Sequence, residues 1–351
     1  MEMAARCAVA GGARWLCVAD AGEATRLRAD GYHGAVFVLY PVPPSKWQEM
    51  ADAGVDVTVA DVEQAAAVAT GVEPRALLHV HVEVDTGMTR GGVPVEDVVA
   101  TARVLVEGPC VVLSGVWTHL AAPEDADTTD AQLARFAEAL DELAVAGIDP
   151  GMIHAAASGG LLATDVSGHG LVRPGLAFYG LHPGAGEDLP ATVTPALSVR
   201  ACPVRVVEVP AGTRVGYGGT WTAQRSSTIA TLPIGYADGW SRSSSPGTFA
   251  IANGHRAPVV GRVSSDSLTV DVSGIDDVGV DTELTLLGSE GGESIDADEV
   301  AEVRGTISWE VLQQLGARLT RVYVSGSRPV AVRPESNVEV VVTDESAVPC
   351  Y

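Results

Sequence analysis

Cationic and hydroxyl side chains stand at the ends of several predicted strands, and together they could bind an anion. The first is Arg90, in a polar loop that follows the alternating, β-branched stretch 77–85. Later strand-like stretches end in His119, in Ser158-Gly159-Gly160, and in Arg173 close to Gly175. Free backbone N–H groups and a hydroxyl can cradle a phosphate, so the set predicts an anion-binding pocket. Taken singly, each residue fits a structural role better, such as a core histidine or an ion-paired arginine.

Two tyrosines in the second half of the chain are flanked by glycines, which leaves their rings exposed. Tyr217 lies in Val215-Gly216-Tyr217-Gly218, and Tyr236 lies in Ile234-Gly235-Tyr236-Ala237-Asp238-Gly239. A phenol near cationic groups can have its pKa lowered enough to act as a base. Both tyrosines are therefore candidates for proton transfer, and the alternative is a pair of turn tyrosines.

Alternating strands and helices in the first half of the chain predict parallel βαβ units. We expect seven strands, centred near residues 17, 38, 58, 81, 115, 155 and 172, with helices between them that include 130–146. So many units in succession favour a closed α/β barrel, in which catalytic groups lie at the carboxyl ends of the strands. Such a barrel has about eight strands, so we expect the first strand to be missing.

The pattern changes after about residue 196. Strands become short and frequent, with glycine or proline turns between them and one late helix at 308–316. This pattern is typical of an antiparallel β domain. The sequence therefore predicts a barrel domain over residues 1–195 and a C-terminal β domain over residues 196–351.

The composition narrows the classes of partner and of compartment. The chain has 45 acidic and 22 basic residues, a formal net charge of -23, which disfavours nucleic acid and anionic membranes. No stretch is long and apolar enough to span a bilayer, and the N-terminus lacks an apolar leader segment. The five cysteines show neither pairing nor metal-ligand spacing. We expect a cytoplasmic protein without a metal.

Seven ordered motifs across the chain resemble those of alanine racemase. That family consists of pyridoxal-phosphate (PLP) enzymes with an α/β barrel and a C-terminal β domain, which form head-to-tail dimers. The matching segments are Val84-Asp85-Thr86-Gly87-Met88-Thr89-Arg90, Trp117-Thr118-His119, His154-Ala155-Ala156-Ala157-Ser158, 172–180, Val215-Gly216-Tyr217-Gly218, 233–239, and Gly261-Arg262-Val263 with Asp266. The resemblance implies isomerase chemistry in amino-acid metabolism, with a small amino acid or a related small molecule as substrate.

The resemblance also implies a role for each matching residue. Arg173 faces the pyridine nitrogen of the cofactor and, being always protonated, keeps that nitrogen unprotonated, with His119 beside it. Arg90 hydrogen-bonds the phenolic oxygen of the cofactor. Tyr217, from the other subunit, is the base for the L-face proton. The remaining residues are the phosphate ligands Ser158, Gly175 and Leu176, and the groups at the substrate end and entrance, Asp266, Tyr236, Ser265, Arg242 and Arg262.

Several positions depart from the family pattern. The Schiff-base lysine of the family lies on the first barrel strand, before the point that corresponds to Met1, and the only lysine of this sequence is Lys46. Other residues replace common family residues as follows: Glu83 a modified lysine, Ala157 an asparagine, Ser264-Ser265 a Cys-Met pair, and Trp309 a second phosphate-binding tyrosine. Three hypotheses remain open: a longer chain that is an ordinary racemase, a divergent enzyme that is PLP-independent or uses PLP without the lysine, and a non-catalytic dimer partner.

Overall fold

The computed structural model describes residues 2–184, 188–190, 192–325, 328–333 and 339–344. The chain forms two compact units. Unit 1 comprises Met1–Phe178 and His182–Pro190, and unit 2 comprises Tyr179–Leu181 and Ala191–Tyr351. Gly180 lies where the chain first enters unit 2, at a φ of +76°, and a Cβ there would stand 1.9 Å from the carbonyl oxygen of Thr194. Only glycine allows this close approach.

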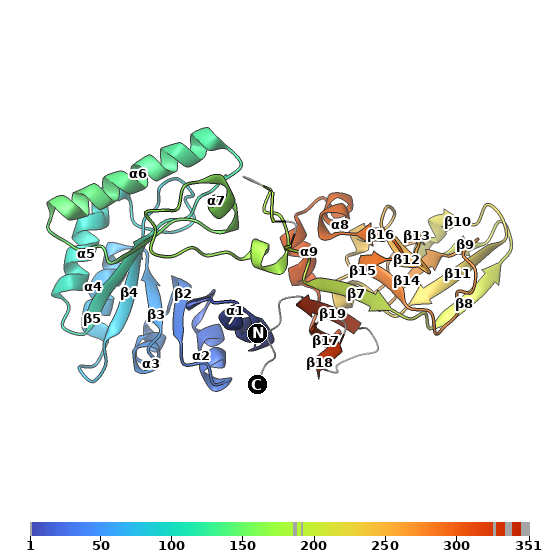
Figure 1. The fold of residues 1–351 in the computed structure, drawn as a ribbon, viewed down its shortest axis with the longest axis horizontal. Helices are drawn as coiled ribbons and strands as arrows, with labels where there is room; N and C mark the ends of the chain where they lie inside the picture. Colours follow the sequence, from blue (N-terminus) through green and yellow to red (C-terminus); the bar gives the residue numbers. More distant parts are fainter. Residues whose placement is uncertain (1, 185–187, 191, 326–327, 334–338, 345–351) are drawn as a thin grey trace. The chain divides into compact units, whose positions relative to one another are not determined.

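Unit 1 is built on a parallel sheet of six strands in sequential order (Figure 1). The strands are β1 (Trp15–Val18), β2 (Ala35–Pro41), β3 (Asp56–Val59), β4 (Leu78–Glu83), β5 (Val111–Trp117) and β6 (Met152–His154). The helices are α1 (Glu2–Ala10), α2 (Ala21–Ala29), α3 (Trp47–Asp52), α4 (Val62–Gly71), α5 (Val98–Glu107), α6 (Ala126–Val145) and α7 (Ser158–Ala163), with short 3₁₀ turns η1 (Pro44–Lys46), η2 (Val95–Asp97) and η3 (Leu176–Tyr179). The last residue of η3, Tyr179, belongs to unit 2.

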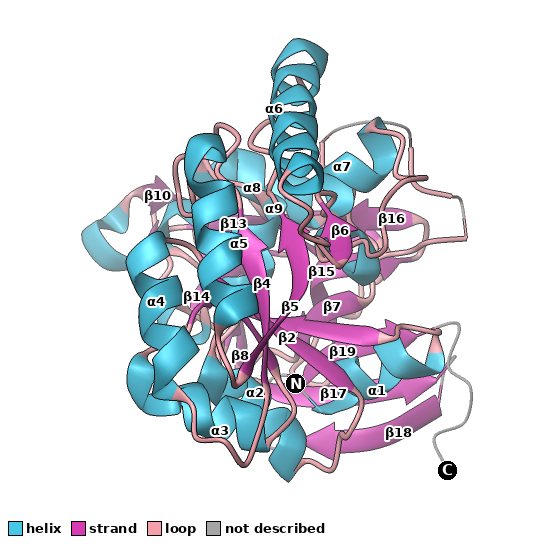
Figure 2. Ribbon diagram, turned by 90° about the vertical axis from the view of Figure 1, so that its left-hand side faces the viewer, coloured by secondary structure: helices cyan, strands magenta, loops and turns pink. Residues whose placement is uncertain are grey.

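The alternation in β4 explains how the sheet presents chemistry on one face. Leu78, Val80 and Val82 are fully buried in the core between the sheet and its helices. Since successive side chains of a strand point to opposite faces, His81 and Glu83 lie on the other face. Figures 1 and 2 show α4 and α5 beside β4 and β5 on the helical side. The face opposite these helices is the one that carries polar and aromatic groups.

The prediction of a seventh strand near residue 172 is wrong. Residues 171–173 form only an isolated parallel bridge, between Arg173 and Ala157. The backbone N–H of Arg173 donates to Ala156 at 2.9 Å, but Pro174 follows at once and has no N–H to continue a ladder. In the part of unit 1 that the structure describes, the parallel sheet therefore has six strands rather than seven. The barrel-type α/β class is nevertheless confirmed.

Unit 2 is a mostly antiparallel β domain, as the sequence predicts. Its large sheet has the order β18-β17-β19-β7-β15-β12-β13-β14-β11-β8, with β16 on β15; only β17 and β19 pair in parallel. The strands are β7 (Leu197–Ala201), β8 (Arg205–Val209), β11 (Ser227–Leu232), β12 (Phe249–Ala252), β13 (His255–Val260), β14 (Leu268–Asp271), β15 (Leu284–Glu290), β16 (Glu293–Ile295), β17 (Thr320–Ser325), β18 (Arg328–Arg333) and β19 (Glu339–Asp344).

Smaller elements of unit 2 carry the residues of interest. A two-stranded ribbon pairs β9 (Arg214–Val215) with β10 (Trp221–Thr222), and the turn between them is η4 (Tyr217–Gly219). The other elements are η5 (Tyr236–Asp238), η6 (Arg242–Ser244), α8 (Ala297–Arg304) and α9 (Ser308–Gln314). Among the described residues, no helix is long and apolar enough to cross a membrane.

Candidate active site

Arg173 is the most buried cation of unit 1's polar face, with 7% of its surface exposed. Its Nη2 donates to the carbonyl oxygens of Thr118 (2.8 Å) and Ala155 (2.9 Å), which follow β5 and β6. Its guanidinium also stacks on the Trp117 ring, with 4.9 Å from Cζ to the ring centroid. Burial lowers the pKa of Arg173 to about 10, so the guanidinium stays charged at neutral pH. The carboxyl edge of the sheet therefore holds a fixed positive charge.

A chain of hydrogen bonds runs from Arg173 into the sheet. Arg173 Nη1 lies 2.6 Å from His154 Nδ1, His154 Nε2 lies 3.0 Å from His81 Nδ1, and His81 Nε2 lies 3.1 Å from Asp56 Oδ2. A guanidinium can only donate, so His154 Nδ1 must accept and its proton sits on Nε2. His81 then accepts at Nδ1 and donates to Asp56 from Nε2. This assignment leaves every donor in the chain with an acceptor.

Two histidines beside Arg173 are held neutral. Burial lowers the pKa of His154, and the positive charge of Arg173 lowers it further. The pKa of His119 falls to about 4, again through burial first and then through Arg173 and Arg90. His119 Nδ1 lies 3.5 Å from Arg173 Nη2, at the limit of a hydrogen bond. At neutral pH these imidazoles therefore act as hydrogen-bond groups rather than as cations.

Ser158 and the segment after Arg173 form a small cradle of polar groups. Ser158 is nearly buried at the start of α7, and its Oγ accepts from the backbone N–H groups of Gly175 (2.9 Å) and Ala177 (3.1 Å). A hydroxyl that accepts twice still has its own proton to donate. Apart from Gly175 and its chain neighbours, no heavy atom of the described residues lies within 4 Å of the position a Cβ would take there, so this side of the cradle is open. Leu176 follows directly, as the first residue of η3.

Arg90 and His119 line one pocket, together with Glu83. The pocket has a volume of about 200 Å³ and also includes Leu39, Tyr40, Pro41, Gly91 and Trp117. Arg90 stacks on Tyr40, with 5.5 Å between its Cζ and the ring centroid. Burial raises the pKa of Glu83 to about 7, an effect that Arg90 and Arg173 partly offset. Among the described residues, no salt bridge within 4 Å joins Glu83 to Arg90.

The loop that carries Arg90 is ordered by Asp85. The Oδ1 atom of Asp85 accepts from the N–H groups of Gly87 and Thr89, both at 3.0 Å. Gly92 sits at a φ of +103°, and a Cβ there would lie 2.6 Å from the Asp85 nitrogen. The loop must therefore turn back tightly against the end of β4. This turn brings Arg90 to the same pocket as Glu83.

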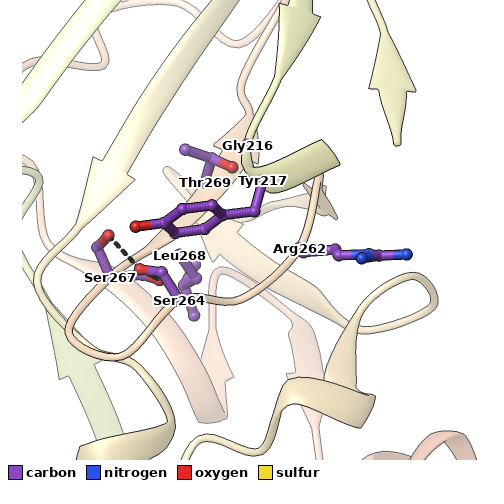
Figure 3. A pocket seen from close by; sticks show the side chains of 7 residues that line it. All are labelled: Gly216, Tyr217, Arg262, Ser264, Ser267, Leu268 and Thr269. Atoms are coloured by element: carbon purple, nitrogen blue, oxygen red, sulfur yellow. Dashed lines mark hydrogen bonds between the residues drawn. The ribbon is translucent and has the colours of Figure 1, made fainter. Parts of the chain in front are cut away.

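In unit 2, the turn of Tyr217 borders a second pocket of about 360 Å³ (Figure 3). Gly216, Arg262, Ser264, Ser267, Leu268 and Thr269 line it with Tyr217. The Tyr217 ring and the Arg262 side chain extend in opposite directions in this view. Tyr217 is 71% exposed, so its phenol is accessible from outside unit 2. Arg214 fixes the turn by donating from Nη2 to the carbonyl oxygen of Gly218 at 2.8 Å.

Tyr236, Ser265 and Asp266 lie on two loops of unit 2 that contact each other. The backbone N–H of Tyr236 donates to Ser264 (3.0 Å), and that of Ala237 donates to Ser265 (2.9 Å). Arg318 and Ser265 hydrogen-bond to Asp266 and hold the pKa of its carboxyl below the usual range. Tyr236 is half exposed. The structure thus brings these three predicted residues together.

The remaining predicted residues of unit 2 are placed separately. Arg242 is the first residue of η6. Trp309 lies in α9 and packs on Tyr179, with ring centroids 5.6 Å apart at 54°. Among the described residues, no cluster of histidine, cysteine or acidic side chains could hold a metal ion.

Sequence reasoning missed several residues that position the site. Asp56 and His81 extend the chain behind Arg173, and Gln132 of α6 donates to Thr86 Oγ1 (3.1 Å) and to the His119 carbonyl oxygen (3.2 Å). Arg318 was also missed. For His81 a signal existed, because it shares the period-2 face of β4 with Glu83. For Asp56, Gln132 and Arg318 no local pattern points to the site.

The chain is similar to alanine racemases along most of its length. The family model described as alanine racemase, N-terminal domain, matches residues 1–183, and that described as alanine racemase, C-terminal domain, matches residues 196–323. The alanine racemase of Desulfosudis oleivorans is 36% identical over 333 residues, covering 91% of this chain and 85% of that protein.

Two solved structures share the fold. The alanine racemase of Bacillus anthracis, with bound L-Ala-P, superposes with a TM-score of 0.87 at 32% identity, covering 94% of this chain and 86% of that one. The histidine racemase of Leuconostoc mesenteroides subsp. sake superposes with a TM-score of 0.83 at 26% identity, covering 93% and 88%. Proteins of this fold thus include racemases named for two different amino acids.

Proposed function

Because the chain belongs to the alanine racemase family, we propose that it racemises a small amino acid with pyridoxal phosphate as cofactor. The observation that supports this most is the environment of Arg173. Its charge is buried, its protons are directed to neutral His154 and to two carbonyl oxygens, and it lies at the carboxyl edge of the sheet. An arginine held in this way is suited to face a neutral ring nitrogen.

The residues present fit the cofactor. Ser158 has a hydroxyl proton to donate to a phosphate, and Gly175 leaves open space beside it. We propose that Ser158, Gly175 and Leu176 hold the phosphate. Arg173 would hold the pyridine nitrogen, and Arg90 the phenolic oxygen of the cofactor.

When bound, pyridoxal phosphate supplies the electron withdrawal that acidifies the α-proton of an amino acid. Arg173 limits that withdrawal, because a guanidinium does not pass its proton to a pyridine nitrogen. His119, neutral at pH 7, adds no competing positive charge beside the ring. The expected consequence is α-proton exchange with little loss of substrate to side reactions.

Tyr217 is proposed as the base that exchanges the α-proton on the L face. Its exposure in a single chain supports action on the site of a second copy, in a head-to-tail homodimer. The substrate end and entrance would be formed by Tyr236, Ser265, Asp266, Arg242 and Arg262. A small amino acid is the proposed substrate, and a cytoplasmic location is part of the same proposal.

A second candidate is a repurposed or non-catalytic role on the same fold, and Glu83 gives a specific reason to keep it. Glu83 stands where the family usually has a modified lysine, and burial raises the pKa of its carboxyl to about 7. Lys46 shows no sign of a catalytic role, because its Nζ lies 2.6 Å from Glu49 Oε2 in an exposed ion pair on η1 and α3.

The experiment that tests the proposal is retention of the cofactor. The chain is incubated with pyridoxal phosphate and dialysed, and its visible absorbance is recorded with and without hydroxylamine. We expect a visible absorbance band of retained pyridoxal phosphate, which hydroxylamine removes. Because Lys46 is ion-paired with Glu49, Lys46→Ala should leave this band unchanged. A chain that retains no cofactor contradicts the proposal and favours the second candidate.

A further inference from the structure

Arg318, which follows α9 in unit 2, lies between the carboxylates of Asp238 and Asp266. Its Nε and Nη2 donate to Asp238 Oδ1 at 3.0 and 2.9 Å, and the same Nη2 donates to Asp266 Oδ1 at 2.8 Å. The two aspartates stand on different loops. One guanidinium therefore joins two segments that are 28 residues apart in the chain.

The Asp238 end of this link is anchored inside the unit. Asp238 is 3% exposed, and its Oδ2 accepts from the N–H of Gly235 at 2.9 Å, which closes the turn around Tyr236. Its own carbonyl oxygen accepts from Gly316 at 2.9 Å, so the segment before Arg318 is tied to the same turn. A buried carboxylate bonded on both oxygens has little freedom to move.

The Asp266 end is exposed and would be mobile without a partner. The Asp266 side chain is 66% exposed, and hydrogen bonds from Arg318 and Ser265 hold it. The loops also meet through backbone atoms, because a Cβ at Gly235 would lie 2.4 Å from the carbonyl oxygens of both Ser264 and Ser265. Backbone contact sets the spacing of the loops, and Arg318 sets the direction of the Asp266 carboxylate.

We propose that Arg318 is a positioning residue for the substrate end of the site, which holds Asp266 and the Tyr236 turn in one fixed arrangement. The inference rests on the proposed function, in which Tyr236, Ser265 and Asp266 face a substrate. Arg318 acts through these residues, because its Nε and Nη2 are directed to the two carboxylates. Losing it would loosen substrate binding more than it would slow proton transfer.

The test compares substitutions at Arg318 for their separate effects on KM and kcat. Arg318→Met removes both carboxylate links, and we expect KM for the amino acid to rise about tenfold while kcat changes much less. Arg318→Lys keeps the charge but not the planar fork, so its KM should lie between those of the unsubstituted chain and of Arg318→Met. Arg256→Met is the matched control, because Arg256 of β13 forms an arginine–carboxylate pair with Glu299 of α8 in the same unit, and neither residue belongs to the two loops.

A second measurement does not depend on activity. In a double-mutant cycle on urea unfolding, Arg318→Met and Asp266→Asn should be non-additive, since each removes the contact between Arg318 and Asp266. Additive unfolding effects, or equal KM values for Arg318→Met and Arg256→Met, overturn the inference. Absence of turnover in the unsubstituted chain overturns the proposed function instead, and the unfolding cycle still reports whether Arg318 and Asp266 are coupled.

Discussion

Glu83 is buried beside two arginines that favour its ionised form, yet its pKa is raised. It sits at the end of β4, facing the same pocket as Arg90, yet burial outweighs the two arginines and raises the pKa of its carboxyl to about 7. The folded chain therefore keeps the Glu83 proton at pH values at which the unfolded chain has lost it. The protonated form can donate a hydrogen bond, which an ionised glutamate cannot.

This pKa predicts how Glu83 affects stability with pH. Since the folded pKa is raised from 4.5 to about 7, Glu83 costs no stability below pH 4.5, and the cost grows as the pH rises through 7. We expect Glu83→Gln to stabilise the chain by roughly 2 kcal/mol at pH 8 and by almost nothing at pH 4.5. Urea unfolding at the two pH values measures the difference.

Glu138 provides the control for that measurement. It is exposed on the outer side of α6, so Glu138→Gln should change stability equally little at both pH values. A Glu83→Gln chain that gains no more than this control at pH 8 would show that Glu83 is already ionised in the folded state.

At the scale of elements, the close contact of two loops positions Tyr217. Gly216 and Gly261 both adopt positive φ, and a Cβ at Gly261 would lie 2.9 Å from the carbonyl oxygen of Val215. Neither residue could be replaced without moving the turn that carries the phenol. The loop 261–262 is therefore part of the support for Tyr217.

Gly261→Ala should destabilise the chain by about 2–3 kcal/mol, through backbone strain and the contact with Val215 together. Gly212→Ala is the matched control, because Gly212 has a φ of +86° but open space around its Cβ position. It carries only the strain, of about 1 kcal/mol. If thermal or urea unfolding shows the same loss of stability for the two variants, the close contact between Gly261 and Val215 does not contribute to the effect.

Much of the arrangement of helices and strands could be predicted from local sequence. The errors of that prediction have physical causes. The alternation in β4 marked a strand because its apolar residues share one face. Residues 171–173 looked similar, but a stretch closed by Pro174 is too short to form a ladder. Helix α6 begins at Ala126, not at Asp130, because the Asp125 side chain accepts from the Thr128 N–H and caps it. Residues 126–129, which the predicted helix over 130–146 leaves out, thus form the first turn of this helix.

The candidate site was only partly predictable for a different reason. Arg90 and His119 could be grouped because both follow parallel strands, whose carboxyl ends share an edge. The contact between Arg318 and Asp238 joins residues 80 positions apart, and neither lies at the end of a barrel strand. Such contacts depend on how strands and loops are arranged in unit 2, which local patterns do not specify.

At the scale of the whole molecule, the proposal requires two copies of the chain to complete one site. If Tyr217 acts on the partner's site, then Tyr217→Phe and Arg173→Gln chains, each inactive alone, should regain about a quarter of the activity when co-assembled. Half of the dimers would be mixed, and each mixed dimer would contain one unaltered site. Separate purification followed by simple mixing without subunit exchange is the control. No recovery in co-assembled protein would place Tyr217 and Arg173 in the site of one chain.

The most direct test of racemase chemistry at this site is α-proton exchange followed by proton NMR. The chain loaded with pyridoxal phosphate is incubated with L-alanine in D₂O, beside a Tyr217→Phe chain that retains the same cofactor. We expect loss of the α-proton signal with the unsubstituted chain, and a rate at least about 100-fold lower with Tyr217→Phe. Retained cofactor with no exchange of alanine or of any other small amino acid would contradict racemisation and show that this fold serves another purpose.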